Sequence, residues 1–148
     1  MTNYLERPAV LYLDDEPYCL DVFLEMFADD YDVRTARTYE EARRALRERA
    51  FDIVVSDQFM PDGDGVAFLA EAARAQPAAF RILLTGGTHL GALVREMAAG
   101  VFHLFATKPW TERSMREKLE RARARDSVAA PTGEIPARLD SAREPFAA

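Results

Sequence analysis

The run Ile53-Val54-Val55-Ser56-Asp57 decides the fold that this sequence adopts. Its first three residues are apolar with no polar alternation, which is typical of a strand that is covered on both faces. Strands of this kind form parallel sheets, and this run ends directly in the acidic side chain of Asp57. The run therefore predicts a central strand of a parallel sheet with a charged group at its carboxyl end.

Four more runs predict the other strands of that sheet. Val-Leu-Tyr-Leu at 10–13 and Ile-Leu-Leu at 82–84 are also apolar throughout and predict central strands. The run 32–35 is shorter and more polar, which suits an edge strand, and Val101–Phe105 is apolar except for His103. We expect five strands in total.

Stretches with helical periodicity separate the strands. Apolar residues there recur with the spacing of a helix face, and we expect each set to pack on the core. The sets are Leu20, Phe23, Leu24 and Phe27; Ala42, Ala45 and Leu46; Val66, Leu69, Ala70 and Ala73; Leu90, Leu93, Val94 and Met97; and Met115, Leu119 and Ala122. Thr38 and Glu41 have the spacing of a capping box at the start of the second helix. Alternating strands and helices predict an α/β fold around a parallel sheet.

The composition is that of one globular domain. The chain has 148 residues, 49% of them hydrophobic, which is enough for a core without disulfides or metals. The net charge of −6 argues against direct nucleic-acid binding. We find no signal peptide and no apolar run long enough for a membrane span, so we expect a cytoplasmic protein without a membrane partner. The periodic pattern ends after Arg125, and we expect 126–148 to be a flexible tail or linker.

Acidic, hydroxyl and amine side chains follow the expected strands. Asp14 and Asp15 follow the first strand, Asp57 the third, Thr85 the fourth and Lys108 the fifth. Ligands of an open parallel sheet bind outside the carboxyl ends of the strands, so we expect these groups to face one cleft. Three carboxylates that lie close together repel one another, and a hard divalent cation such as Mg²⁺ would neutralise them. Phosphoryl transfer needs mainly positioning and charge neutralisation, which this set of groups can supply.

Four motifs resemble those of a known family. They are Leu13-Asp14-Asp15-Glu16-Pro17, Ser56-Asp57-Gln58-Phe59-Met60-Pro61 followed by Gly65, Leu84-Thr85-Gly86, and Lys108-Pro109-Trp110. Each follows an expected strand, and together they resemble the response-regulator receiver domain over residues 8–125. The resemblance implies a doubly wound five-stranded parallel sheet with strand order 2-1-3-4-5 and five surrounding helices.

The resemblance also implies the roles of the site residues. Asp57 would be the nucleophile that accepts a phosphoryl group from a sensor histidine kinase or a histidine phosphotransfer protein. Asp14 and Asp15 would bind Mg²⁺ together with Asp57 and the backbone carbonyl of Phe59. Lys108 would contact the phosphoryl group.

A switch is implied for Thr85 and Phe105. The Thr85 hydroxyl would move toward the phosphoryl group, and the aromatic side chain three residues before Lys108, here Phe105, would turn inward. A plain core role for Phe105 is the alternative. Gly86 and Gly87 follow the switch threonine, and we expect this flexible pair to weaken the coupling between phosphorylation and helix movement.

Phe59 departs from the pattern that would favour rapid loss of the phosphoryl group. It places a bulky apolar side chain two residues after the acceptor, where a polar residue would help orient an attacking water. We therefore expect slow self-dephosphorylation. Self-phosphorylation and self-dephosphorylation of Asp57 are the reactions that we expect, without turnover of a separate substrate.

Three interpretations of the function stay open. The chain is a stand-alone phosphoacceptor switch whose output is binding to a downstream protein target, a phosphorylation-independent interaction module, or the receiver part of a longer response regulator. The fold also allows a homodimer through the face formed by the fourth helix, the fifth strand and the fifth helix. We expect Asp62 and Asp64 to be solvated, and His89 and His103 to lie in loops or on the surface without forming a zinc site.

Overall fold

The computed structural model describes residues 7–86 and 90–132. Its elements in chain order are β1 (Ala9–Leu13), α1 (Pro17–Phe27), β2 (Asp32–Ala36), α2 (Tyr39–Glu48), β3 (Ile53–Asp57), β4 (Phe59–Met60), β5 (Gly63–Asp64), α3 (Gly65–Ala75), β6 (Phe80–Thr85), α4 (Leu90–Ala98), β7 (Leu104–Thr107) and α5 (Glu112–Thr132). No helix in the described part of the chain is long and apolar enough to cross a membrane.

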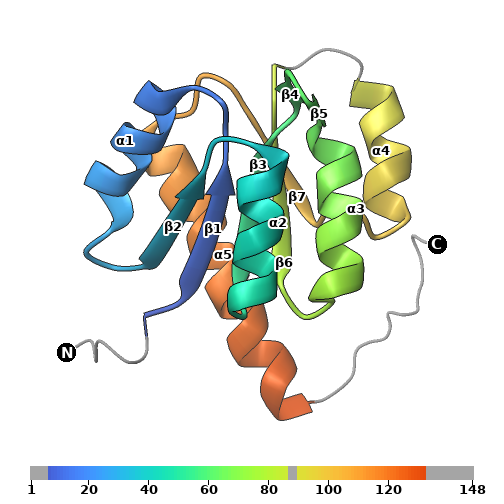
Figure 1. The fold of residues 1–148 in the computed structure, drawn as a ribbon. Coiled ribbons are helices and arrows are strands. Elements are labelled where there is room, and N and C mark those ends of the chain that lie inside the picture. Colours follow the sequence, from blue (N-terminus) through green and yellow to red (C-terminus); the bar gives the residue numbers. More distant parts are fainter. Residues whose placement is uncertain (1–6, 87–89, 133–148) are drawn as a thin grey trace.

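Five strands form one parallel sheet, in the order β2-β1-β3-β6-β7 (Figure 1). This confirms the predicted doubly wound α/β fold and its strand order. β3 lies at the centre, between β1 and β6, and all of its five residues are buried. The order reverses between β1 and β3, which places the ends of these two strands at the position where such sheets bind ligands. β4 and β5 form a separate short antiparallel pair that the sequence did not predict.

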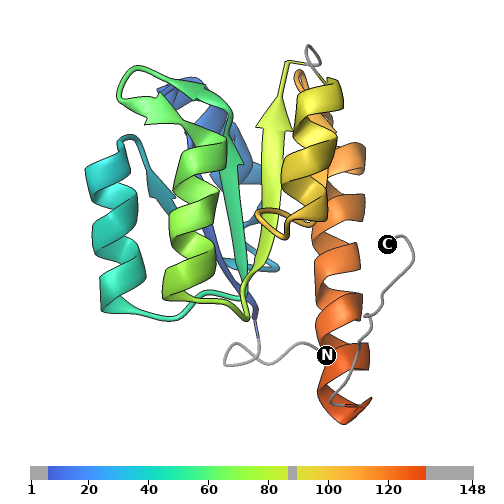
Figure 2. The ribbon, with the colours of Figure 1, turned by 90° about the vertical axis from the view of Figure 1, so that its right-hand side faces the viewer.

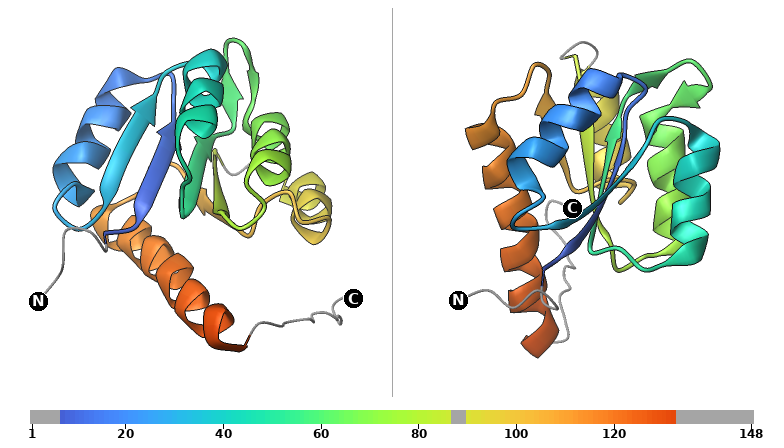
Figure 3. Two further views of the ribbon diagram at one scale, coloured as in Figure 1. Left: turned by 60° about the horizontal axis from the view of Figure 1, so that its bottom comes forward. Right: turned by 60° about the vertical axis from the view of Figure 1, so that its left-hand side comes forward.

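Helices cover both faces of the sheet. Figures 2 and 3 show α1 and α5 on one face and α2, α3 and α4 on the other. Alternate residues of the central strands point into the two layers: Leu11 and Val54 belong to the core beneath α2 and α3, and Val10 and Val55 to the core beneath α1 and α5. Burial on both faces explains why these strands have no polar alternation.

Side chains at the starts of α2 and α3 fix the loops near the carboxyl end of β3. The first half of the predicted capping box is present, since the Glu41 amide donates to Thr38 Oγ1 at 3.1 Å. The Glu41 carboxylate accepts instead from the amide of Arg37, the residue before the cap. Asp64 caps α3 by accepting from an amide, and Asp62 accepts from the Tyr39 amide at 2.9 Å. Asp62 and Asp64 are exposed, as expected, and each also accepts a hydrogen bond that fixes the loop around it.

The last strand of the sheet begins later than the sequence predicted. β7 spans Leu104–Thr107, and not Val101–Phe105. Residues 100–103 form a connection that Arg81 of β6 holds: its guanidinium donates to the carbonyls of Gly100 and Val101, both at 2.9 Å. Phe102 in this connection is 1% exposed. The apolar run that suggested a strand is in part a loop that packs into the core.

Two helices also differ from expectation. Val94 of α4 is 54% exposed, so the apolar stripe of that helix does not pack wholly on the core. The helix α5 continues beyond Arg125 to Thr132, so the first residues of the predicted tail are helical (Figure 3). The rest of the predicted tail, 133–148, lies outside the described residues, and so do Gly87 and His89.

Candidate functional site

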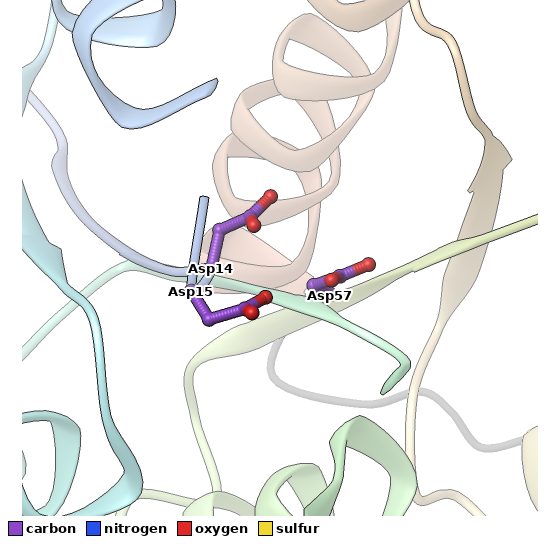
Figure 4. A group of neighbouring side chains, drawn as sticks. All are labelled: Asp14, Asp15 and Asp57. Carbon is purple, nitrogen blue, oxygen red and sulfur yellow. The ribbon is translucent and has the colours of Figure 1, made fainter. Parts of the chain in front are cut away.

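Three carboxylates meet at the carboxyl end of the sheet (Figure 4). Asp14 and Asp15 directly follow β1, and Asp57 is the last residue of the neighbouring strand β3. Each offers a carboxylate oxygen, and these atoms all lie within 4.8 Å of one another. Asp14 and Asp57 are buried, at 0% and 8% exposure, whereas Asp15 is partly exposed. The predicted convergence of the three acids is therefore present.

Lys108 supplies a positive charge to this acidic cluster. Its Nζ lies 3.2 Å from Asp57 Oδ1 and 3.6 Å from Asp14 Oδ2. The backbone amide of Lys108 donates to the carbonyl of Thr85, which ties the segment after β7 to the end of β6. The peptide bond between Lys108 and Pro109 is cis. One lysine thus joins two acids that come from different strands.

Asp57 lies in an environment that disfavours its charged form. Burial raises the pKa of Asp57, and the nearby Asp14 carboxylate raises it further, while Lys108 and the Gln58 amide lower it in part. Partial burial would lower the pKa of Lys108, but Asp14 and Asp57 outweigh this effect and the net pKa is raised. The lysine therefore stays protonated, and the carboxylates retain an excess of negative charge.

Asp14 is held by donors on both sides. Its Oδ1 accepts from the Glu16 amide at 3.0 Å, and its Oδ2 accepts from the Tyr12 hydroxyl at 2.7 Å. Tyr12 was not predicted as a site residue, because it stands inside an apolar strand run. An unusual tyrosine two residues before the acidic pair was the only available signal.

The remaining predicted site residues lie on β6, β7 and β4. Thr85 is buried at the end of β6 and pairs in register with Thr107. Phe105 lies opposite Leu83 in the sheet and packs half-buried against the core beneath α2, α3 and α4. Phe59 begins β4, and 62% of it is exposed. The switch role of Thr85 and Phe105 and the metal role of the Phe59 carbonyl stay predictions.

Gly65 allows α3 to start against the backbone of Asp57, the candidate nucleophile. A Cβ at this position would lie 2.2 Å from the Asp57 carbonyl oxygen and 2.9 Å from Ser56 Oγ. The Gly65 amide donates to the carbonyl of Gln58, which closes the loop after β3. Only glycine fits this approach, which explains its place eight residues after the candidate nucleophile.

The donor set suits a hard divalent cation. Carboxylate oxygens are the ligands that Mg²⁺ prefers, and Lys108 neutralises only part of the charge on three acids. Within the part of the chain that the structure describes, the Asp15 carboxylate makes no hydrogen bond or ion pair. It also lines a hollow of about 480 Å³ with Arg37 and Asp62, so small solutes can reach it. His103 does not contribute, since its Nδ1 accepts from the backbone amide of Arg81, away from this site.

Comparisons with known proteins agree with this geometry. The family model of the response regulator receiver domain matches residues 10–120. Transcriptional regulatory protein GlrR of Escherichia coli K12 is 32% identical over 118 residues, which cover 78% of this chain and 26% of that protein. Response regulator protein PilR of Pseudomonas aeruginosa is 29% identical over 76% of this chain and 25% of its own length. The chain spans about a quarter of the length of these curated relatives.

A solved structure supports the same assignment. The signal receiver domain of an HD domain-containing protein from Pseudomonas fluorescens Pf-5 has a TM-score of 0.77 and 25% identity, and the match covers 88% of this chain and 97% of that one. The fold, the clustered acids and the matched family model all lead to one conclusion. This chain belongs to the response regulator receiver domain family of two-component systems.

Proposed function

We propose that this domain is a phosphoacceptor switch that takes a phosphoryl group on Asp57. The observation that carries the proposal is the position of the Asp57 carboxylate, which lies beside the acids Asp14 and Asp15 and 3.2 Å from the ammonium of Lys108. The phosphodonor is the phosphohistidine of a sensor histidine kinase or a histidine phosphotransfer protein. These partners would place the domain in the cytoplasm.

The transfer step is a displacement at phosphorus. An Asp57 carboxylate oxygen forms the new P–O bond, the P–N bond to the donor histidine breaks, and the imidazole leaves with the bonding electron pair. Lys108 lies close enough to Asp57 to pair with a phosphoryl oxygen once the carboxylate charge is lost. The buried Thr85 hydroxyl is the candidate donor to another phosphoryl oxygen. Positioning and charge neutralisation supply the catalysis.

Asp14, Asp15 and Asp57 would hold Mg²⁺, together with the backbone carbonyl of Phe59. When bound, the ion neutralises the carboxylates and the phosphoryl oxygens as they approach one another. The excess negative charge at the cluster and the Asp15 carboxylate, which is open to solvent, support this assignment. Without a cation, the three acids would repel an approaching phosphate group, and Lys108 alone would offset only part of that repulsion.

The output is a change in a protein-binding surface formed by α4, β7 and α5. This face has the exposed Val94 and a hollow of about 550 Å³, which Met97, Phe102 and Arg121 line in part. A downstream protein is the proposed occupant, and a homodimer through the same face is the other outcome that a binding assay can return. Because the curated relatives are about four times as long, the receiver part of a longer regulator is the favoured alternative to a stand-alone switch.

Phosphorylation by a small donor tests the proposal. The protein is incubated with acetyl phosphate and MgCl₂, and intact mass spectrometry measures the added phosphate. We expect wild type and the matched control Asp21→Asn, an exposed acid of α1, to gain one phosphate, and Asp57→Asn to gain none. Equal labelling of Asp57→Asn would refute the assignment of the nucleophile, and an unlabelled wild type would favour the phosphorylation-independent interaction module.

A further inference from the structure

Tyr12 brings a polar group into an otherwise apolar strand. It lies in β1, is 0% exposed and belongs to the core beneath α1 and α5, where its ring contacts Phe23 at 4.6 Å between centroids. A phenylalanine would fill the same space without a buried hydroxyl to satisfy. The hydroxyl instead donates to Asp14 Oδ2 at 2.7 Å. Its presence is therefore explained by its contact with the acidic cluster better than by packing.

The Tyr12 hydroxyl completes the set of donors around Asp14. Oδ1 accepts from the Glu16 amide, and Oδ2 faces both the Tyr12 hydroxyl and, at 3.6 Å, the Lys108 ammonium. A buried carboxylate that is held at both oxygens has one fixed orientation. Asp15 has no such donor among the described residues. The orientation of the Asp14 carboxylate is therefore fixed by hydrogen bonds, whereas that of Asp15 is not.

The ring of Tyr12 is itself held in place by other aromatic side chains of the same core. Phe23 packs against it with the two rings tilted, and Trp110, two residues after Lys108, packs edge-on against Phe23 at 6.0 Å between ring centroids. Trp110 also packs against Phe27, the next aromatic residue of α1, at 6.4 Å between ring centroids. This packing leaves the hydroxyl little freedom to turn away from Asp14.

We propose that Tyr12 is a positioning residue for the metal and phosphoryl site, in which its buried hydroxyl holds Asp14 in the orientation that Mg²⁺ binding requires. The inference rests on the proposed function, because it assigns to Tyr12 the support of an acid in that same site. Groups that hydrogen-bond a metal-binding acid from behind fix its orientation, and their loss commonly weakens metal affinity by about 10–100-fold.

The experiment measures Mg²⁺ affinity directly, apart from any phosphoryl transfer. Isothermal titration calorimetry with MgCl₂ is performed on wild type, Tyr12→Phe and Tyr31→Phe. Tyr31 is the matched control, since it is 1% exposed and lies in the same core, where its ring contacts Phe27. Thermal unfolding in EDTA accompanies each titration, because a purely structural tyrosine would change the melting temperature and leave the dissociation constant for Mg²⁺ unchanged.

We expect Tyr12→Phe to bind Mg²⁺ about tenfold more weakly than wild type and Tyr31→Phe to bind it as wild type does. If wild type and Tyr12→Phe bind Mg²⁺ equally, the positioning role is refuted while the proposed function stands. Equal weakening in both variants would also refute it, because it would trace the loss to general loosening of the core. A wild type that takes up no Mg²⁺ would overturn the proposed function itself, and the inference with it.

Discussion

Gly65 lets α3 approach the backbone of Asp57 closely, and its replacement tests that packing. In Gly65→Ala the new Cβ would meet the Asp57 carbonyl oxygen, a backbone atom that cannot move without shifting Asp57. We expect a loss of about 3 kcal/mol in the free energy of unfolding, as overpacked sites show, and slower phosphorylation by acetyl phosphate. Urea unfolding and phosphate uptake measure the two effects.

The control for this variant is Gly91→Ala in α4. A Cβ at Gly91 meets nothing within 4 Å, so alanine is expected to leave phosphate uptake unchanged and to stabilise the helix by up to about 1 kcal/mol. If the two alanine variants unfolded at the same urea concentration, the close approach of α3 to Asp57 would not constrain this position.

Phe59 is predicted to protect the phosphorylated form from water. Its side chain is largely exposed at the start of β4, two residues after the acceptor, and carries no group that could orient a nucleophile. Phe59→Asn introduces an amide, and we expect the phosphate on Asp57 to be lost roughly tenfold faster, a modest gain for an oriented water. Decay of the phosphorylated mass after removal of the donor measures this rate, with the exposed Val94→Asn as control. Identical decay of both variants would eliminate the protective role.

At this scale, the sequence predicted which charged groups come together at the candidate site and missed the groups that hold them in place. Asp57 and Lys108 could be found because parallel strands bring their carboxyl ends together, whatever the side-chain details. Tyr12 could not, because a hydroxyl inside an apolar run does not reveal its partner. The hydrogen bond that Asp62 accepts was missed for the same reason, since its donor is an amide 23 residues away.

Among the elements, the connection between α4 and β7 depends on one buried arginine. Arg81 is 5% exposed, and its guanidinium donates to four backbone carbonyls, those of Pro77, Ala79, Gly100 and Val101. Lysine keeps the charge but cannot reproduce this planar set of donors. We expect Arg81→Lys to lower the free energy of unfolding by about 2 kcal/mol, because buried carbonyls lose their donors.

Urea unfolding of Arg81→Lys beside Arg44→Lys measures this effect. Arg44 is an exposed residue of α2, so its conservative replacement is expected to change stability by less than about 0.5 kcal/mol. Equal stability of the two lysine variants would mean that the connection holds its place without the guanidinium.

The same arginine explains why the boundaries of β7 were misplaced. Periodicity cannot distinguish a short apolar strand from an apolar loop, and Phe102 is as buried as the residues of a strand. The loop is held by donors on Arg81 of β6, one of which binds the carbonyl of Val101, 20 positions further along the chain. The local sequence does not reveal such a contact. The ends of strands β1, β3 and β6 were predicted to within two residues. These strands are buried on both faces, so their sequences are runs of consecutive apolar residues.

On the scale of the whole molecule, we expect the buried charge of Asp57 to lower the stability of the metal-free fold. Burial and Asp14 raise the pKa of Asp57 above its ordinary value, so the folded state disfavours the carboxylate that exists at neutral pH. The stability of the metal-free wild type is therefore expected to fall as the pH rises through this raised pKa. The attraction of Lys108, at 3.2 Å, opposes this effect without cancelling it.

Removing the charge of Asp57 or adding Mg²⁺ should each relieve the repulsion between the carboxylates of Asp57 and Asp14. The first removes one of the charges, and the second neutralises them. We expect Asp57→Asn to melt at a higher temperature than wild type in EDTA at neutral pH, because it removes one buried charge. MgCl₂ at one hundred times its dissociation constant is expected to stabilise wild type by about 2.7 kcal/mol and to stabilise Asp57→Asn much less, since a ligand carboxylate is gone. Differential scanning calorimetry with EDTA or MgCl₂ measures both shifts, and the exposed control Asp21→Asn should respond as wild type does. If Asp57→Asn melted below wild type in EDTA, the lysine pair would outweigh the repulsion, and the cluster would stabilise the fold before any metal binds.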